Sequence, residues 1–464
     1  MKILHISLGL PPYRTGGLTK YSVDLMLEQS SEHEVFLLYP GKFTVSKKLA
    51  IKKNKSYRNM GIYELVNPLP IPLLNGINQP QLFMKQVDKD IYEEFLKQVN
   101  PDVIHVHTLM GVHKEFFEAA EDLSIKIVFT THDYFGLCSK VNLMDSNGNI
   151  CIDFNSGHNC LSCNVNALSF PIMYAMQSYS YRYLKDSSIV KSLRKLKKNQ
   201  VKNSIKAPNV SEEVTKLEDD NLAIQYVELR KYYLEMFKLV DYFHFNSSIA
   251  KEQFKSFFDV KGKVISISHK DIYDRRQERY SRKKNGSIVR LGYLGPVDIY
   301  KGFYSLKDTL DALKKNGYDN WHLNVYGDFV NDPETYNPKN YTFHGRYEYS
   351  QLKEIFDQVD LLIIPSVWKE TFGFIGLEAQ SYGVPILVSE YVGFKDLIED
   401  GKTGFIYKAN KNDFMNKLSR ILEDTSILDK MNENILKIKF PYSMEQHTNE
   451  IINLYQEVRA GVEE

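Results

Sequence analysis

Residues 364–379, with the sequence IPSVWKETFGFIGLEA, form the most informative stretch of the chain. An apolar run typical of a buried strand ends at Pro365, and the pattern predicts a helix that begins near Gly373. The first amides of such a helix lack partners, and its positive end suits a phosphate or a sugar oxygen. Glu370 in the loop and Glu378 in the helix can accept hydrogen bonds from hydroxyls beside it. The alternative is that both are ordinary solvated glutamates, which are common.

Short β-rich runs alternate with helical patterns on both sides of this stretch, in two series. Such alternation predicts an α/β protein with two doubly wound, Rossmann-like domains, whose ligands bind at the carboxyl ends of the parallel strands. The first series is Lys2–Leu8, Glu34–Tyr39, Val103–His107, Ile125–Thr131, Tyr242–Asn246 and Lys263–Ser268. The second is Ile288–Leu294, Trp321–Gly327, Tyr341–Gly345, Asp360–Ser366, Val384–Ser389 and Gly404–Tyr407.

A hydrophilic stretch, residues 270–287, separates the two series and marks the expected domain boundary. We therefore expect an N-terminal domain over residues 1–270 and a C-terminal domain over residues 285–440. Residues 441–464 have the apolar spacing of an amphipathic helix, which we expect to return to the N-terminal domain.

Composition excludes several classes of function. The 464 residues include 59 basic and 58 acidic side chains, so no global charge favours nucleic acid as a partner. The apolar runs are far shorter than a membrane span, and the N-terminus has the pattern of a first strand rather than of a secretion signal. We therefore expect a cytoplasmic protein without disulfides.

An oversized connection, residues 135–238, interrupts the first series and holds all of the cysteines. Four thiolates are enough to close a tetrahedral zinc site, and we favour structural zinc over inert thiols or an iron–sulfur centre. Nothing in the chemistry considered below needs this metal. His158 is a substitute ligand that four sulfurs make unnecessary. The four cysteines are Cys138, Cys151, Cys160 and Cys163.

The same connection contains a basic segment, residues 181–206, in which Ile189, Leu193 and Leu196 have helical spacing. Two interpretations stay open. The segment is either a solvated helix face or a surface that meets anionic lipid or a lipid-diphosphate acceptor. The second interpretation would give the protein a peripheral position at the inner face of the membrane.

The stretch 364–379 resembles the E-x7-E region of the family 4 retaining glycosyltransferases of the GT-B fold. Further matches follow in the family's order along nearly the whole chain. They are Pro11-Pro12 to Gly16-Gly17, His132, Asn246-Ser247-Ser248, Gly295, Lys301-Gly302, Gly327-Asp328, Gly345, Ser389, Gly393 and Gly401 to Gly404. The resemblance implies two domains that face each other across a cleft, a nucleotide diphosphate sugar as donor, and no catalytic metal.

The resemblance also implies roles for individual residues. Glu378 would hold the ribose hydroxyls of the donor, and Lys301 would neutralise its phosphates, where negative charge develops as the nucleoside diphosphate leaves. Glu370 would hold the transferred sugar together with the amides at the helix tip, which also bind the diphosphate. Those amides belong to Gly373, Phe374 and Ile375.

One position departs from the family pattern. The family usually has an arginine directly after the glycine of the first C-terminal strand, where this chain has Pro296. Arg346 or Arg14 could supply the missing cation, and the sequence does not decide between them. Solvated surface arginines are the alternative for both.

Gly16 and Gly17 follow the first strand, where a doubly wound domain brings its backbone close to a ligand, although an ordinary turn is the alternative. His132 follows the fourth strand of the first series, and in the family the matching histidine contacts the donor sugar near its reacting carbon. His105 and His107 alternate on the preceding strand and so share one face. For any of these histidines, a structural hydrogen-bonding role is the alternative.

The sequence thus predicts a retaining, metal-independent hexosyltransferase that acts in surface polysaccharide or glycolipid assembly. Its expected partners are a nucleotide sugar donor and a sugar, lipid-linked or protein acceptor. In the scheme that the family implies, the leaving phosphate oxygen takes the acceptor's proton on the same face, so no carboxylate nucleophile is needed. A nucleotide-sugar epimerase of the same fold and a non-catalytic binding or scaffold protein are the alternatives.

Overall fold

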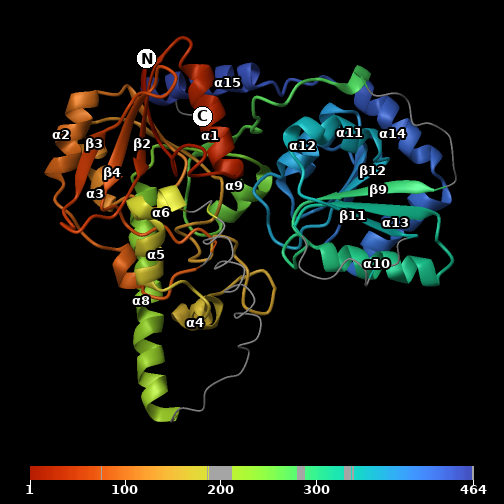
Figure 1. Cartoon of the computed structure of the whole chain (residues 1–464), viewed down its shortest axis with the longest axis horizontal. Helices are drawn as coiled ribbons and strands as arrows, with labels where there is room; N and C mark the ends of the chain where they lie inside the picture. Colours follow the sequence, from red (N-terminus) through yellow and green to blue (C-terminus); the bar gives the residue numbers. More distant parts are fainter. Residues whose placement is uncertain are drawn as a thin grey trace. The chain divides into compact units, whose positions relative to one another are not determined.

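The computed structural model describes residues 1–74, 76–184, 187, 212–278, 288–328, 336 and 339–461. Contacts within the chain divide it into two compact units (Figure 1). Unit 1 comprises Met1–Phe243 with Tyr455–Glu464, and unit 2 comprises His244–Leu454.

The first sheet has eight strands in the order β3-β4-β2-β1-β5-β6-β7-β8. The pairs β1–β2, β2–β4, β1–β5 and β5–β6 are parallel, whereas β3 lies antiparallel to β4 at the edge. The strands are β1 (Lys2–Ile6), β2 (Glu34–Pro40), β3 (Ala50–Lys53), β4 (Gly61–Val66), β5 (Val103–Val106), β6 (Ile127–Thr130), β7 (Tyr242–Phe245) and β8 (Gly262–Val264).

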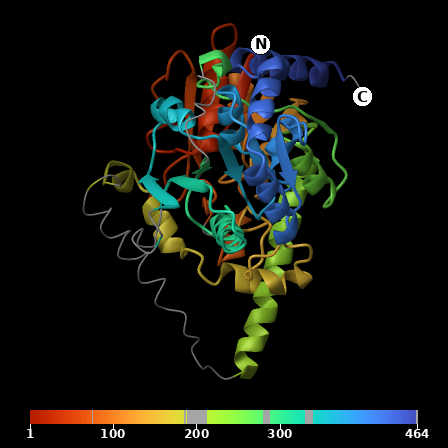
Figure 2. The same cartoon turned by 90° about the vertical axis from the view of Figure 1, so that its right-hand side faces the viewer.

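Helices connect the strands of unit 1, and several more belong to the long connection after β6. Figures 1 and 2 show α8 as one long, uninterrupted helix. The helices are α1 (Gly17–Gln29), α2 (Asp90–Val99), α3 (Lys114–Asp122), α4 (His158–Asn164), α5 (Phe170–Met176), α6 (Tyr179–Leu184) and α8 (Glu212–Lys238). The last helix of the chain, α15 (Met444–Ala460), ends in unit 1.

The second sheet is entirely parallel, with six strands in the order β11-β10-β9-β12-β13-β14. The central strands β9 and β12 are buried along most of their length, as expected of a sheet covered on both faces. The strands are β9 (Val289–Leu294), β10 (Trp321–Tyr326), β11 (Tyr341–Gly345), β12 (Leu361–Ile364), β13 (Ile386–Ser389) and β14 (Gly404–Tyr407).

Helices lie on both faces of the second sheet: Figure 1 shows α10 and α13 on one face and α11 and α12 on the other. Apolar residues of α10 and α13, among them Phe303 and Phe414, pack with the strands in one buried cluster. The helices of unit 2 are α9 (Ser248–Lys255), α10 (Phe303–Lys315), α11 (Leu352–Asp357), α12 (Phe374–Ser381), α13 (Lys411–Glu423) and α14 (Ser426–Lys437).

The predicted fold class, two doubly wound α/β domains, is confirmed. The sequence pattern missed β3 and β4. In β4 the apolar run is interrupted by Glu64, which is buried and accepts a hydrogen bond from the backbone N–H of Lys42 (3.0 Å). The contacts group His244 onward with unit 2, although β8 pairs in the first sheet, so the predicted boundary at 270–287 stays a prediction.

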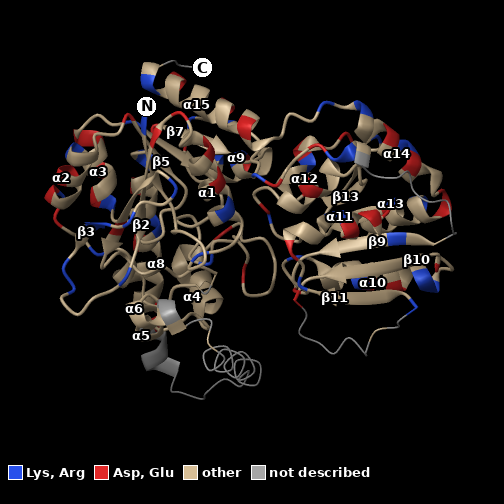
Figure 3. Ribbon diagram, turned by 45° about the horizontal axis from the view of Figure 1, so that its top comes forward, with Lys and Arg blue, Asp and Glu red and all other residues tan. Residues whose placement is uncertain are grey.

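Acidic and basic residues are interspersed over the described helices (Figure 3). Several form pairs one turn apart, such as Lys97 with Glu93 and Lys353 with Asp357. Within the described ranges, no helix combines the length and the apolar character that crossing a membrane requires. Most of the basic segment 181–206 lies outside the described residues.

Candidate functional site

The loops that follow β9 and β12 meet at the carboxyl edge of the second sheet. Gly302 has φ +73°, and a Cβ on it would lie 1.7 Å from the carbonyl oxygen of Pro365, so only glycine fits there. The backbone N–H of Val367 donates to the carbonyl oxygen of Tyr300 (3.0 Å). This close approach places Lys301 next to the loop that carries Glu370.

Lys301 and Glu370 form a half-buried ion pair. Lys301 Nζ lies 2.6 Å from Glu370 Oε1, and the hydroxyl of Ser366 donates to Glu370 Oε2 (2.8 Å). Lys301 Nζ also lies 5.6 Å from the ring centroid of Trp368, within the range of a cation–π contact. The indole Nε1 of Trp368 is buried and has no hydrogen-bond partner among the described residues. The pair is therefore held in place beside a donor that lacks an acceptor.

Glu370 lies directly at the tip of α12. Its Oε1 is 3.9 Å from the point that a Cβ on Gly373 would occupy. Gly373 has φ +100° and precedes the helix, and no side chain caps its first turn. The first helical amides, those of Phe374 and Ile375, have no intrahelical acceptor because of their position. An anionic group at this tip would meet amides, a helix dipole and the Lys301 ammonium together.

Gly376, in the first turn of α12, is packed against another loop of unit 2. A Cβ on Gly376 would lie 2.3 Å from the ring of Phe394, so this glycine is needed for packing inside unit 2. Gly373 is also restricted by a neighbour, since its Cβ would lie 2.8 Å from Val392.

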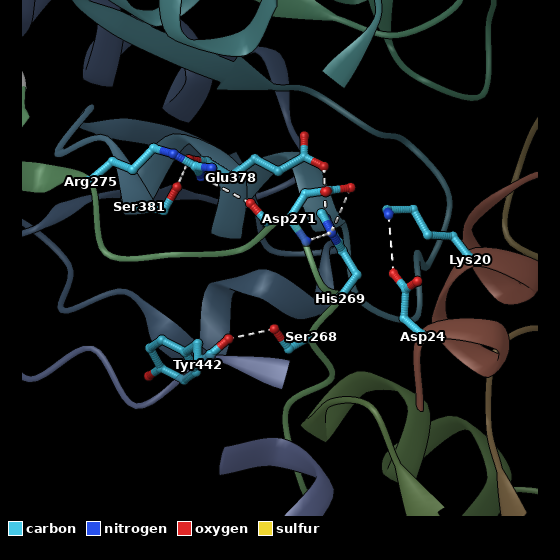
Figure 4. A network of polar contacts seen from close by, with 9 residues as sticks. All are labelled: Lys20, Asp24, Ser268, His269, Asp271, Arg275, Glu378, Ser381 and Tyr442. Atoms are coloured by element: carbon cyan, nitrogen blue, oxygen red, sulfur yellow. Dashed lines mark hydrogen bonds and ion pairs between the residues drawn. The ribbon is translucent and has the colours of Figure 1, made fainter. Parts of the chain in front are cut away.

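Glu378 is almost completely buried, with 2% of its surface exposed, and one of its oxygens is fixed by His269 (Figure 4). His269 Nε2 lies 3.1 Å from Glu378 Oε1. The backbone N–H of Asp271 donates to His269 Nδ1 (3.2 Å), so Nδ1 is the acceptor and Nε2 carries the proton given to Glu378. Glu378 Oε2 has no hydrogen-bond partner among the described residues. A buried carboxylate oxygen left in this state is an acceptor available to a ligand hydroxyl.

The segment that carries His269 runs along α12 (Figure 4). The backbone N–H of Arg275 donates to the carbonyl oxygen of Ser381 (2.8 Å), and its guanidinium donates to the carbonyl oxygen of Asp271 (2.9 Å). The ring of His269 also packs edge-on against Phe374, at 5.1 Å between centroids. Sequence reasoning missed His269, which stands 109 residues from Glu378 at the edge of the predicted linker.

Arg346 follows β11 and forms a salt bridge with Asp328. Its Nε and Nη2 donate to the two carboxylate oxygens of Asp328 (2.6 and 2.5 Å), and its side chain is 81% exposed. The expectation that Arg346 replaces the family arginine at Pro296 therefore requires it to leave or share Asp328. The other candidate, Arg14 in unit 1, stacks its guanidinium on the ring of Tyr13 at 4.7 Å.

In unit 1, the glycine pair and His132 are linked through α1. Gly16 has φ +110°, with open space where its Cβ would be, and α1 begins at Gly17 without a side-chain cap. Tyr21, about one turn into α1, lies 4.9 Å from the ring of His132. His132 Nε2 lies 3.2 Å from Nδ1 of His107, which is buried. The structure thus places the glycine pair, His132 and His107 at one edge of unit 1.

The four cysteines are half-buried and all are free thiols. The backbone N–H of Lys140 donates to Cys138 Sγ (3.4 Å). Burial raises the pKa of the Cys160 thiol to about 12, although Arg230 acts in the opposite direction. Within the described part of the chain, one group of three potential metal ligands has all its ligand atoms within 4.8 Å of one another, and it consists of histidines. His158, the substitute ligand, contacts Asp220 instead (2.9 Å).

Residues 274–437 match the family model described as "Glycosyl transferases group 1". They span the six strands of the second sheet, Lys301, Glu370 and all of α12. This segment is therefore similar to group 1 glycosyltransferases.

Curated relatives align with parts of the chain. A 41.2 kDa uncharacterised protein in the cps region of Klebsiella pneumoniae is 26% identical over 183 residues, which are 39% of this chain and 48% of that protein. The capsular polysaccharide biosynthesis glycosyltransferase CapM of Staphylococcus aureus is 25% identical over 171 residues, 35% of this chain and 43% of CapM. The chain thus aligns with about half or less of each relative.

Solved structures are similar over nearly the whole chain, and at their low identity they show the fold alone. Anabaena Alr3699/HepE in complex with UDP has a TM-score of 0.56 at 15% identity, covering 98% of this chain and 100% of that one. Sucrose-phosphate synthase from Thermosynechococcus elongatus has a TM-score of 0.55 at 13% identity, covering 99% of both chains. The two α/β units therefore match the two Rossmann-like domains of the GT-B fold.

Proposed function

We propose that the protein is a retaining, metal-independent glycosyltransferase of family 4 that moves a hexosyl group from a nucleotide diphosphate sugar to an acceptor hydroxyl. The observation that carries the proposal is the buried Oε2 of Glu378, which has no hydrogen-bond partner among the described residues. Glu378 lies on the same short helix whose uncapped tip adjoins the Lys301–Glu370 pair. An acceptor for hydroxyls, a set of free amides and a fixed cation match the ribose, the diphosphate and the leaving-group charge of such a donor.

Each of the site residues described above in unit 2 has a role in this proposal. Glu378 accepts from the ribose hydroxyls through Oε2, while His269 holds Oε1. The amides of α12 and Lys301 bind the diphosphate, and Lys301 stabilises the charge that develops as the bond to the sugar breaks. Glu370 orients the transferred sugar and, before the donor binds, keeps the Lys301 ammonium paired.

The proton balance follows from retention. The acceptor hydroxyl attacks the face that the diphosphate leaves, and the departing phosphate oxygen takes the hydroxyl proton, so the new glycosidic bond replaces the old one with the same configuration. In unit 1, His132 positions a hydroxyl of the donor sugar, and the loop at Gly16 and Gly17 approaches the diphosphate. Arg346 would add a second cation once released from Asp328.

Relatives support the class of donor and of pathway. Alr3699/HepE has been solved with UDP and with UDP-glucose, and CapM is named for capsular polysaccharide biosynthesis. On this basis the proposed donor is a nucleotide diphosphate sugar, and the acceptor is a sugar or lipid-linked sugar of surface polysaccharide or glycolipid assembly. A protein acceptor and membrane contact through residues 181–206 stay predictions.

The test is a turnover assay with a panel of nucleotide diphosphate sugars and sugar or lipid-linked acceptors, in buffer without added divalent cations, with NMR of the product. We expect a glycoside whose anomeric configuration matches the donor, and loss of turnover in Glu370→Ala. A converted nucleotide sugar formed without acceptor would instead indicate an epimerase. If the protein shows no turnover and binds no nucleotide of the panel, the proposal is contradicted and a binding or scaffold protein is favoured.

We also propose that Cys138, Cys151, Cys160 and Cys163 hold a structural zinc ion. An N–H donor already faces Cys138 Sγ, as is common for zinc-bound thiolates, and a metal would overcome the raised pKa of Cys160 by binding its thiolate. Zinc binding requires the loop to draw the four sulfurs together. Metal analysis of purified protein should give about one zinc per chain, lost in Cys160→Ser. Zinc well below one equivalent would contradict this.

A further inference from the structure

Three buried histidines lie together in unit 1, and they raise the question of a metal site. His5 and His105 pair in register on neighbouring strands β1 and β5, and His107 follows β5 directly. None of the three is more than 1% exposed, and their ligand atoms all lie within 4.8 Å of one another. The hydrogen bonds of their ring nitrogens decide what this cluster does.

One arm of hydrogen bonds runs from Gln29 to His132. His5 Nε2 lies 2.8 Å from Gln29 Oε1, and His5 Nδ1 lies 3.0 Å from His107 Nε2. His107 Nδ1 in turn lies 3.2 Å from His132 Nε2. Both nitrogens of His5 and both nitrogens of His107 are therefore occupied.

A second arm starts from the same glutamine. Gln29 Nε2 donates to the hydroxyl oxygen of Tyr455 (3.3 Å), and that hydroxyl lies 2.5 Å from His105 Nδ1. His105 Nε2 lies 2.6 Å from Thr130 Oγ1. Each ring nitrogen of the cluster thus has a protein partner, so a metal ion would have to displace one at every ligand. The cluster is a hydrogen-bonded chain rather than a ready metal site.

The two arms have a defined direction because the Gln29 amide has one acceptor and one donor. Gln29 Oε1 can only accept, so His5 carries its proton on Nε2 and accepts at Nδ1. A neutral His107 then donates from Nε2 and accepts at Nδ1, and His132 donates from Nε2. Burial lowers the pKa of His5 to about 4, which keeps this ring neutral near pH 7. The opposite amide orientation would reverse every proton in both arms.

We infer that Gln29, acting through His5 and His107, fixes His132 with its proton on Nε2, so that Nδ1 of this ring can only accept a hydrogen bond, including one from a ligand. The inference rests on the proposed function only for the identity of that ligand, a donor-sugar hydroxyl. Tyr21 packs against the rings of both His107 and His132, at 5.7 and 4.9 Å, and limits their rotation. Gln29 and His107 are positioning residues.

The first test uses NMR of the full chain labelled with ¹⁵N-histidine, which reports the tautomer of each neutral ring without donor, acceptor or turnover. We expect His5, His105, His107 and His132 all to carry the proton on Nε2 near neutral pH. A proton on Nδ1 with a bare Nε2 at His5, His107 or His132 would overturn the inference. Failure of the glycosyltransferase proposal would leave this spectrum unchanged, so the two failures are distinguishable.

The second test uses Gln29→Glu, which replaces the donor of the second arm with an acceptor. The Tyr455 hydroxyl must then donate to residue 29, and His105 must donate from Nδ1 to Tyr455. We expect the Nδ1–H form of His105 to change from the minor to the major form, with His5, His107 and His132 unchanged. An unchanged His105, or a changed His132, would contradict the assigned direction.

His113→Phe is the matched control for this variant, and the wild-type spectrum remains decisive if Gln29→Glu does not fold. His113 is 1% exposed in the same unit, but its Nδ1 contacts Tyr92 (2.7 Å) and it takes no part in the chain. We expect His113→Phe to leave the tautomers of all four histidines as in the wild type. A tautomer change at His132 in this control would show that general repacking, rather than Gln29, sets the proton.

Discussion

Glu378 in unit 2 and His5 in unit 1 are both buried titratable side chains at the centre of polar networks, but the networks end differently. Both ring nitrogens of His5 have partners inside the protein. Glu378 has one oxygen held by His269 and one with no partner among the described residues. A closed network stabilises and orients its members, whereas an open one is completed by a ligand. The difference separates a positioning device from a binding site.

The largest expected effect is in the candidate site of unit 2, where Glu378 has an oxygen left for a ligand. Lys301→Ala removes the cation that would face the leaving diphosphate, and we expect turnover to fall by about 10²- to 10³-fold, the usual cost of losing one fixed stabilising group. Lys369→Ala, which removes a neighbouring lysine outside the Lys301–Glu370 pair, is the control and should retain activity. Equal loss in both variants, measured as kcat, would contradict a specific role for Lys301.

The buried histidine network of unit 1 predicts a pH effect on the free energy of unfolding. Because the pKa of His5 is about 4 in the folded protein and 6.5 ordinarily, the unfolded chain binds the proton more tightly. His5 therefore contributes stability that is complete above about pH 6.5 and is lost as pH falls toward about 4, by about 3 kcal/mol. Urea unfolding across this range should show the loss, and His5→Asn should reduce the pH dependence.

A smaller effect should follow from removing the hydrogen bond that His269 donates to Glu378. His269→Phe removes the only described donor to Oε1 and leaves a buried carboxylate without partners, so we expect nucleotide affinity to fall by about 5- to 30-fold, equivalent to about 1–2 kcal/mol. His269→Gln keeps a donor near the position of Nε2 and should restore most of the affinity. Titration calorimetry measures both, and equal affinity in the two variants would count against the His269–Glu378 link.

The sequence predicted the fold class because alternation between strand and helix patterns survives in any parallel sheet that is covered by helices. It predicted the helix at residues 374–381 and the loop before it, since a run of buried residues and a positive-φ glycine leave local signals. It missed β4, where Glu64 breaks the apolar run but is satisfied by a backbone N–H. A polar residue that is paired through tertiary contacts looks exposed in the sequence.

The candidate site was predictable in its residue types but not in its partners. His269 lies beside a hydrophilic stretch and gives no local signal of its contact with Glu378. The pairing of His105 with His5 depends on strand order, and the link to Tyr455 joins residues 350 positions apart. The need for glycine at position 376 comes from the ring of Phe394, which a Cβ there would meet at 2.3 Å. Such relations are set by the fold and are absent from any short window of sequence.

The most direct test of the central claim is calorimetric titration of the wild type, Glu378→Gln and Glu390→Gln with a panel of nucleoside diphosphates. Glu378→Gln replaces the open acceptor with an amide, whereas Glu390 accepts from the backbone N–H of Ala409 (2.8 Å). The account predicts that Glu378→Gln weakens the best nucleotide by about 10- to 150-fold, the range for a hydrogen bond to a charged group, with Glu390→Gln unchanged. Wild-type affinity in Glu378→Gln would contradict it.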